Sequence, residues 1–163
     1  MAKLTGIVFV AAAAIYYAFY GLFVLKQRLD AVRELAAAAV NLRSAVGCTQ
    51  KTVREVFYEM SKTEKTGVFK LFLNGMGEKK NGSELWRECI ETTVLEKAER
   101  DVFLPLGDCL FSADREHSIK ILDLTVESAK RCETVLLDKI EKYRSAEMKI
   151  RLMCGLMAVI LLI

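Results

Sequence analysis

Two uncharged, apolar stretches lie at the ends of the chain, and a charge-rich stretch separates them. No charged residue occurs in residues 5–25 or 152–163, whereas charges of both signs recur every few residues between Lys26 and Arg151. An α-helix rises about 1.5 Å per residue, so about twenty apolar residues match a hydrocarbon core of about 30 Å. The pattern therefore predicts a transmembrane helix near the N-terminus, followed by a charged domain.

A cleaved signal peptide is the alternative interpretation of the first apolar stretch. Lys3 gives it a weak basic start, as a signal peptide requires. The stretch nevertheless continues through bulky tyrosines and phenylalanines and ends at Lys26 without a small-residue cleavage site. We therefore expect residues 1–27 to remain as an N-terminal transmembrane helix.

The second apolar stretch is shorter than the first. Residues 152–163 form only about 18 Å of helix, which is less than a full crossing. We expect residues 151–163 to be a short membrane segment that either crosses a locally thinned bilayer or inserts partway. Basic residues concentrate on the inner flank of both stretches. The positive-inside rule therefore places residues 28–150 in the cytoplasm, with both termini on the opposite side or the C-terminus partly inserted.

The middle domain has the apolar period of helices throughout. Apolar residues recur every three or four positions from Leu29 to Val46, and Gly47 is expected to end that helix. Thr49 and Ser83 are expected to cap two of the shorter helices that follow. Pro105 is expected to interrupt another, because its ring removes an amide donor. No alternating pattern of strand length competes, so the pattern predicts an all-α helical bundle.

The last helix of the middle domain is predicted to be the longest. Ser112 is expected to cap it, with Asp114 and Glu116 complementing the helix dipole. A stripe at every seventh position follows, formed by Leu122, Ala129, Leu136, Tyr143 and Ile150. This stripe predicts one helix that continues without a break into the membrane segment at residues 151–163.

Composition and charge narrow the classes of function. A chain of 163 residues has room for one domain with its anchors, and the net charge of +3 is dispersed, unlike a nucleic-acid-binding surface. The five cysteines are far apart and odd in number, so we expect no disulfide framework. Scattered cysteines of this kind suit a reducing compartment.

Residues for catalysis are sparse. His117 is the single histidine and has no partner at metal-ligand spacing, so an ordinary surface histidine is favoured. Glu88 and Glu91 share a helix face but lack a neighbouring histidine, and a solvated face is favoured for them. Trp86 is expected in the core. The sequence therefore predicts no enzyme, no metal, no cofactor and no small-molecule substrate.

Several short motifs follow one another in a recognisable order. After the first apolar stretch come the segments 26–28 (Lys-Gln-Arg), 106–110 (Leu-Gly-Asp-Cys-Leu), 114–116 (Asp-Arg-Glu) and the terminal 155–163. This order resembles the stage III sporulation protein AB family. The resemblance implies structural signature residues at Arg28, Gly107, Leu110, Asp114 and Gly155, and it implies no catalytic residue.

The resemblance also implies a function. It implies a non-enzymatic membrane platform in the secretion-like channel between mother cell and forespore, with a domain similar to the platform proteins of type II secretion and type IV pilus systems. The expected location is the cell membrane on the mother-cell side, in the outer forespore membrane. The expected partners are a secretion-type ATPase and other sporulation channel membrane proteins, and homo-oligomers are left open.

A second hypothesis belongs to a different class. A membrane-bound helical sensor or signalling adaptor would use the heptad-like stripe between Leu122 and Tyr143 to transmit motion from the bilayer. Sensors usually carry a recognisable output domain, and none is visible in the sequence. The platform is therefore the favoured hypothesis.

Overall fold

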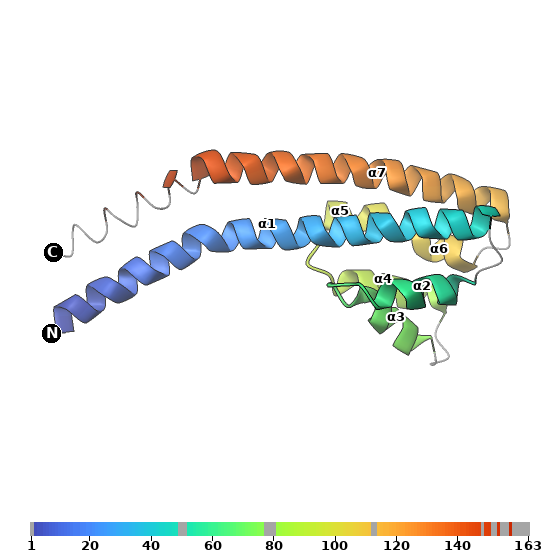
Figure 1. Ribbon diagram of the computed structural model, residues 1–163, viewed down its shortest axis with the longest axis horizontal. Coiled ribbons are helices and arrows are strands. Elements are labelled where there is room, and N and C mark those ends of the chain that lie inside the picture. Colours follow the sequence, from blue (N-terminus) through green and yellow to red (C-terminus); the bar gives the residue numbers. More distant parts are fainter. Residues whose placement is uncertain are drawn as a thin grey trace. The chain divides into compact units, whose positions relative to one another are not determined.

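The computed structural model describes residues 2–48, 52–76, 81–111, 114–147, 149–150, 153 and 157, and within them every regular element is a helix (Figure 1). The elements are α1 (Ala2–Cys48), α2 (Val53–Ser61), α3 (Val68–Gly75), α4 (Gly82–Glu91), α5 (Lys97–Phe103), α6 (Pro105–Phe111), α7 (Arg115–Lys142) and the π-helix η1 (Tyr143–Glu147). The predicted all-α helical bundle is confirmed. The chain divides into two compact units, residues 28–134 and residues 1–27 with 135–163.

Helix α1 is longer than the sequence pattern suggests, because it runs without a break from Ala2 to Cys48. The predicted N-terminal segment and the first helix of the middle domain are therefore one helix. Gly47 lies inside its last turn and does not adopt the left-handed conformation expected of a terminating glycine. Among the described residues, Gly67 is the glycine with positive φ, at 77°.

In the unit 28–134, α1 and α7 run antiparallel (Figure 1). Arg33 Nε of α1 donates to the Glu133 carboxylate of α7 at 2.7 Å, and Arg43 pairs with Asp123. Ten residues further along α1, the partner lies ten residues earlier on α7, which is the register of an antiparallel pair. The buried apolar positions of this unit include, on these two helices, Val32, Leu35, Ala39, Leu42, Leu122 and Ala129.

The shorter helices of this unit build an aromatic core around Trp86. Phe57 of α2 stacks on the Trp86 ring with centroids 5.6 Å apart, and Phe72 of α3 meets the ring edge-on at 5.5 Å. The indole Nε1 donates to the carbonyl of Phe103 at 2.9 Å, so its one polar group is satisfied. Trp86 is fully buried, and its predicted place in the core is confirmed.

The helix starts differ from their predicted capping residues. Thr52 caps α2 in a capping box, and the predicted cap Thr49 lies outside the described residues. Asn81 caps α4 by accepting from the amide of Ser83, so Ser83 is the wrong residue for that role. Pro105 is the first residue of α6, directly after α5 has ended, and the predicted interruption is confirmed.

Helix α7 differs from the prediction at both ends. Asp114 begins it, because its side chain accepts from the amides of Glu116 at 3.0 Å and His117 at 3.3 Å. The predicted cap Ser112 lies outside the described residues. After Lys142 the α-helix changes into the π-helix η1, which the spacing of apolar residues did not predict. The predicted continuation of one helix into residues 151–163 includes residues outside the described ones and stays a prediction.

Within the described part of the chain, no helix combines the length and the apolar character that a membrane crossing requires. Most of the predicted segment 151–163 lies outside the described residues. The membrane helices at 1–27 and 151–163 therefore stay predictions from the sequence.

Candidate functional site

The most unusual polar feature of the unit 28–134 is a buried ion-pair cluster around Arg28. Arg28 Nε donates to Glu99 Oε2 at 3.1 Å, and its two terminal nitrogens donate to Glu99 Oε1 and to Glu96 Oε1. The side chains of Arg28 and Glu99 are 7% and 6% exposed, whereas Glu96 is largely exposed. The guanidinium group therefore binds the buried Glu99 carboxylate with two nitrogens and the exposed Glu96 carboxylate with the third.

Burial and pairing act in opposite directions on Arg28. Burial alone lowers the pKa of its guanidinium, but the hydrogen bonds and charges of Glu99 and Glu96 outweigh that effect and raise it. A buried charge without a partner costs several kcal/mol, roughly, so neither Arg28 nor Glu99 tolerates loss of the other. The pair therefore fixes the position of two segments more than it adds net stability.

Glu99 has a second role at the start of α5. Its Oε2 also accepts from the amide of Glu96 at 3.0 Å, and the Glu99 amide donates to the Glu96 carbonyl at 3.0 Å. The two glutamates form a capping box that holds the first turn of α5. One carboxylate therefore joins that helix start to Arg28 of α1.

Gly107 on α6 marks a close approach to Trp86. A Cβ atom at this position would lie 2.8 Å from Trp86 Cδ1 and 3.2 Å from its Cβ. Any other residue would push the indole from its place in the aromatic core. The neighbouring Asp108 accepts a hydrogen bond from the Ser83 hydroxyl at 2.6 Å, which adds a polar contact between α4 and α6.

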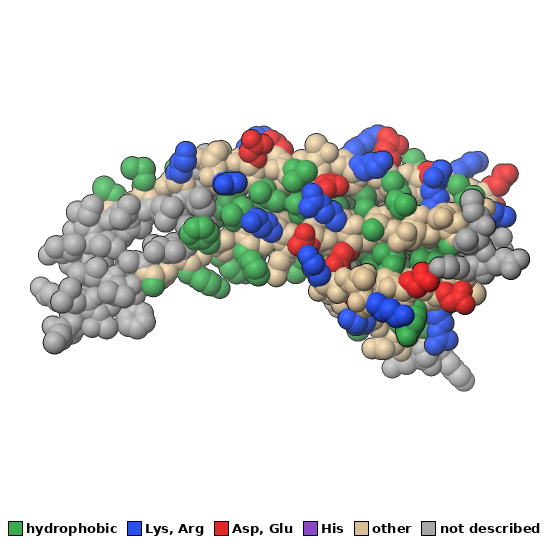
Figure 2. All heavy atoms as spheres, viewed as in Figure 1, with side chains coloured by type: hydrophobic (Ala, Val, Ile, Leu, Met, Phe, Trp, Pro, Cys, Tyr) green, Lys and Arg blue, Asp and Glu red, His purple; other side chains and the backbone are tan. Residues whose placement is uncertain are grey.

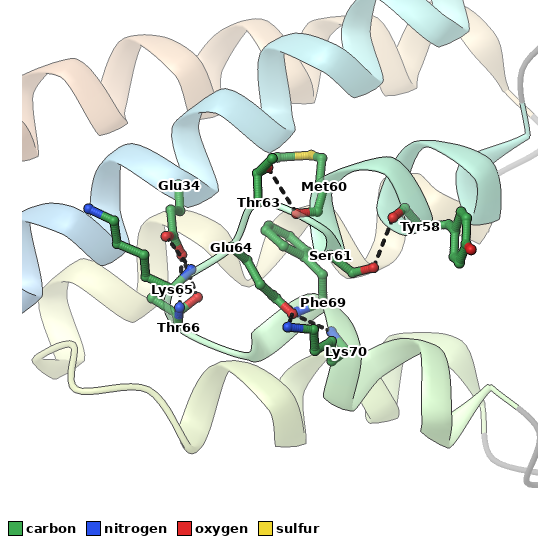
Figure 3. Close-up of polar contacts among 10 residues, drawn as sticks. All are labelled: Glu34, Tyr58, Met60, Ser61, Thr63, Glu64, Lys65, Thr66, Phe69 and Lys70. Carbon is green, nitrogen blue, oxygen red and sulfur yellow. Dashed lines mark hydrogen bonds and ion pairs between the residues drawn. The ribbon is translucent and has the colours of Figure 1, made fainter.

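Two glutamates clamp the connection between α2 and α3 (Figure 3). Glu34 of α1 accepts from the amides of Lys65 at 2.7 Å and Thr66 at 3.1 Å, and from the Thr66 hydroxyl at 2.6 Å. Glu64 accepts from the amide of Phe69 at 2.7 Å and from the next amide at 3.0 Å. Because the N-cap of α3 is Gly67, which has no side chain, Glu64 supplies the missing acceptor.

The structure places three of the five family-signature residues at separate contacts. Arg28 forms the buried ion pair, Gly107 receives the Trp86 ring, and Asp114 begins α7. Leu110 lies on α6. Gly155 lies outside the described residues. None of the described contacts brings these residues into one constellation.

Sequence reasoning missed the acidic partners of Arg28. Glu96 and Glu99 are three residues apart, just before and in the first turn of α5. That spacing is the signal of a capping box and could have located the helix start. The distance of 71 residues between Arg28 and Glu99 hides the ion pair from any local pattern.

The described residues offer little to catalysis. They contain no group of three or more histidines, cysteines or carboxylates that could hold a metal ion. His117 is exposed on the first turn of α7, and Glu84, Glu88 and Glu91 are exposed on α4. Burial, assisted by the charge of Asp108, raises the pKa of the Cys109 thiol to about 11, which makes it a poor nucleophile at neutral pH.

The surface of the unit 28–134 carries both signs of charge. Figure 2 shows basic and acidic side chains interspersed on the face in view. The hollows are open grooves; one of about 380 Å³ lies between α1 and α2 and is lined by both small and polar side chains, including Ala37, Asn41, Val56 and Met60. The fold and these contacts define a helical-bundle protein whose described residues are organised for packing and positioning.

Comparison with known proteins gives the family. The family model described as stage III sporulation protein AB matches residues 3–163. A solved structure of "Stage III sporulation protein AB (SpoIIIAB)" is similar, with a TM-score of 0.63 and 18% identity, over 71% of this chain and 97% of that chain. No protein among the curated sequences matches the chain. The chain belongs to the stage III sporulation protein AB family, a family of sporulation proteins, and shares the fold of that structure.

Proposed function

We propose that this protein is a non-enzymatic scaffold, a platform component of the secretion-like channel that joins mother cell and forespore during endospore formation. The family match over residues 3–163 supports a role in sporulation. The observation that carries the scaffold role is the buried pair of Arg28 and Glu99 at the start of the unit 28–134.

The position of Arg28 explains why this pair matters to a scaffold. Helix α1 contains the apolar residues 5–25 and continues without a break into the unit 28–134. Arg28 is the first residue of that unit and grips the start of α5. The bidentate ion pair therefore ties the first residue of this unit to the start of α5, which is the kind of contact that holds a scaffold in one shape.

Membrane attachment is part of the same proposal. Residues 1–27 and 151–163 attach the chain to the cell membrane on the mother-cell side, and the unit 28–134 faces the cytoplasm. The uncharged stretches and their basic flanks in the sequence support this arrangement. The partners are a secretion-type ATPase and other channel membrane proteins, which the mixed-charge surface would contact without a small-molecule substrate.

Crosslinking in sporulating cells tests the proposal. The tagged full chain should co-purify with channel membrane proteins and a secretion-type ATPase after crosslinking, and its deletion should block late forespore development. The variant Arg28→Ala should lose both properties, whereas Arg43→Ala, which removes an exposed ion pair of the same helix, should keep them. Normal spore yield in the deletion strain, or crosslinks to no channel component, would contradict the proposal.

A further inference from the structure

The seven-residue stripe of α7 stops abruptly at the end of that helix. Leu136 and Tyr143 are buried, with 1% and 6% of their surfaces exposed. Ile150, the next member of the stripe, is 61% exposed, and Met157, one further heptad on, is 62% exposed. Seven residues of α-helix return to within about 20° of the same direction, so an unbroken helix would keep these residues on the buried side.

The π-helix η1 (Tyr143–Glu147) lies where the stripe stops. A π-helical turn accommodates one extra residue, because its hydrogen bonds join residues i and i+5. Compared with an unbroken α-helix, one extra residue turns the described residues that follow by about 100° around the helix axis. That rotation turns Ile150 and Met157 away from the direction of Tyr143, and it brings Met153, which is 68% exposed, onto the same outward face.

The ring of Tyr143 packs closely against Gly21 of α1. A Cβ atom at Gly21 would lie 2.6 Å from Tyr143 Cζ and 2.8 Å from its Cε2, so the tyrosine ring rests directly on the glycine backbone. Both residues belong to the unit of residues 1–27 and 135–163. The ring fixes the rotation of the chain at the first residue of η1.

We propose that η1 rotates the helix so that the apolar residues after it face outward, toward lipid acyl chains. Tyr143 on Gly21 fixes the helix before the π-turn, and the extra residue in that turn directs Ile150, Met153 and Met157 away from α1. This inference rests on the membrane attachment proposed above.

Acyl chains are the occupant that the surface of this unit favours. The exposed side chains Ile150, Met153 and Met157 are all large and apolar. Helix α1 exposes a matching aromatic stripe in the same unit, formed by Tyr16, Phe19, Tyr20 and Phe23. Tyrosines beside phenylalanines suit the zone between acyl chains and headgroups, and the exposed Lys149 next to the stripe can reach the headgroups.

Nitroxide scanning of the full chain tests whether η1 turns these apolar residues toward lipid. Single spin labels at positions 149 to 157, in a cysteine-free background reconstituted into phosphatidylethanolamine and phosphatidylglycerol vesicles, report collisions with oxygen and with a water-soluble nickel chelate. Oxygen collisions should be highest at positions 150, 153 and 157. Deletion of Ser145 removes the residue that the π-turn accommodates, so a regular α-helix can replace η1 without turning the residues that follow, and oxygen collisions should stay highest at 150, 153 and 157. Without an extra residue in η1, the deletion would instead turn these positions by about 100°, and their oxygen collisions would change by about half or more. Ser145→Ala keeps the extra residue and is the matched control.

Five outcomes would overturn the inference. Oxygen maxima at other positions in the undeleted chain would remove the outward stripe, whether or not the deletion variant folds. Oxygen maxima that the Ser145 deletion moves to other positions would remove the role of η1. Nickel collisions above oxygen collisions at the stripe would show water as its neighbour, and spin broadening between copies would show a second copy. Failure of the chain to enter vesicles at all would overturn the proposed membrane attachment as well, and so is distinguishable from the other results.

Discussion

The unit 28–134 and the unit of residues 1–27 with 135–163 bury and expose different kinds of side chain. The first buries a large aromatic core and an ion pair whose members satisfy each other, as Trp86 and the Arg28 pair show. In the second, a tyrosine ring rests on a glycine, and the exposed side chains described on α1 include four aromatic residues. The contrast teaches that the first unit keeps its large aromatic side chains inside, whereas the second exposes several of them on α1.

The strongest disruption of the first unit is expected from Trp86→Ala. Loss of the indole leaves a cavity between α2, α3 and α4, and we expect the free energy of unfolding to fall by about 5 kcal/mol. Denaturant unfolding of the full chain in detergent, followed by circular dichroism, measures the change. Val94→Ala is the control because Val94 is half exposed, and a cost near that of Trp86→Ala there would contradict the aromatic core.

Removal of Arg28 comes next in size. Arg28→Met leaves the Glu99 carboxylate buried without its cation, and we expect a loss of about 3–4 kcal/mol. Adding Glu99→Leu should recover most of this loss, because the double variant has no unpaired buried charge. A double-mutant cycle on the same unfolding assay measures the coupling, and additive losses would refute a coupled pair.

The contact that characterises the second unit is tested by Gly21→Ala. The added methyl group meets the Tyr143 ring, and we expect the thermal midpoint to fall with a cost of about 1–3 kcal/mol. Gly47→Ala is the matched control on the same helix, since no atom lies within 4 Å of the added Cβ. It should gain about 0.5–1 kcal/mol from helix propensity. Equal effects of the two substitutions would argue against the tyrosine contact.

The smallest expected effect is the titration of Cys109. Burial raises the pKa of its thiol from 9.0 to about 11, so the folded state keeps the proton in a range where the unfolded state loses it. The contribution of Cys109 to stability is therefore complete below pH 9 and declines as the pH rises toward 11. In a chain with Cys109 as its one cysteine, reaction with a disulfide reagent should stay slow at pH 8. Fast reaction at pH 8 would show that the thiol is not shielded.

Local sequence patterns predicted the helices well and their ends less well. The period of apolar residues located the helical regions and placed Trp86 in the core, and Pro105 marked the junction between α5 and α6. The caps moved by two or three residues, as at Asn81 in place of Ser83, because several polar residues in a connection compete for the same amides. Which of them wins depends on where the neighbouring helices hold the backbone.

For the candidate functional contacts too, the sequence indicated single residues but not the residues that they contact. Arg28 and Gly107 were singled out by resemblance, but their partners lie far away in the sequence and were not identified. The stripe from Leu122 to Tyr143 was predicted from its seven-residue spacing, yet its end at η1 was not, since Ile150 continues the same spacing. The spacing of apolar residues does not predict a π-turn, because the turn changes the backbone hydrogen bonds and not the residue types.

By itself, the sequence determined the helical class, the separation of apolar ends from a charged middle, and the membership of a sporulation family. These properties follow from residue type and spacing, which act within a few helical turns. Only the tertiary structure decided that Arg28 meets Glu99, that Gly107 receives Trp86, and that Tyr143 rests on Gly21. Each of these contacts joins residues distant in the chain, and their physical basis is the close packing that chain folding imposes, where a single Cβ atom or an unpaired charge is enough to exclude an alternative.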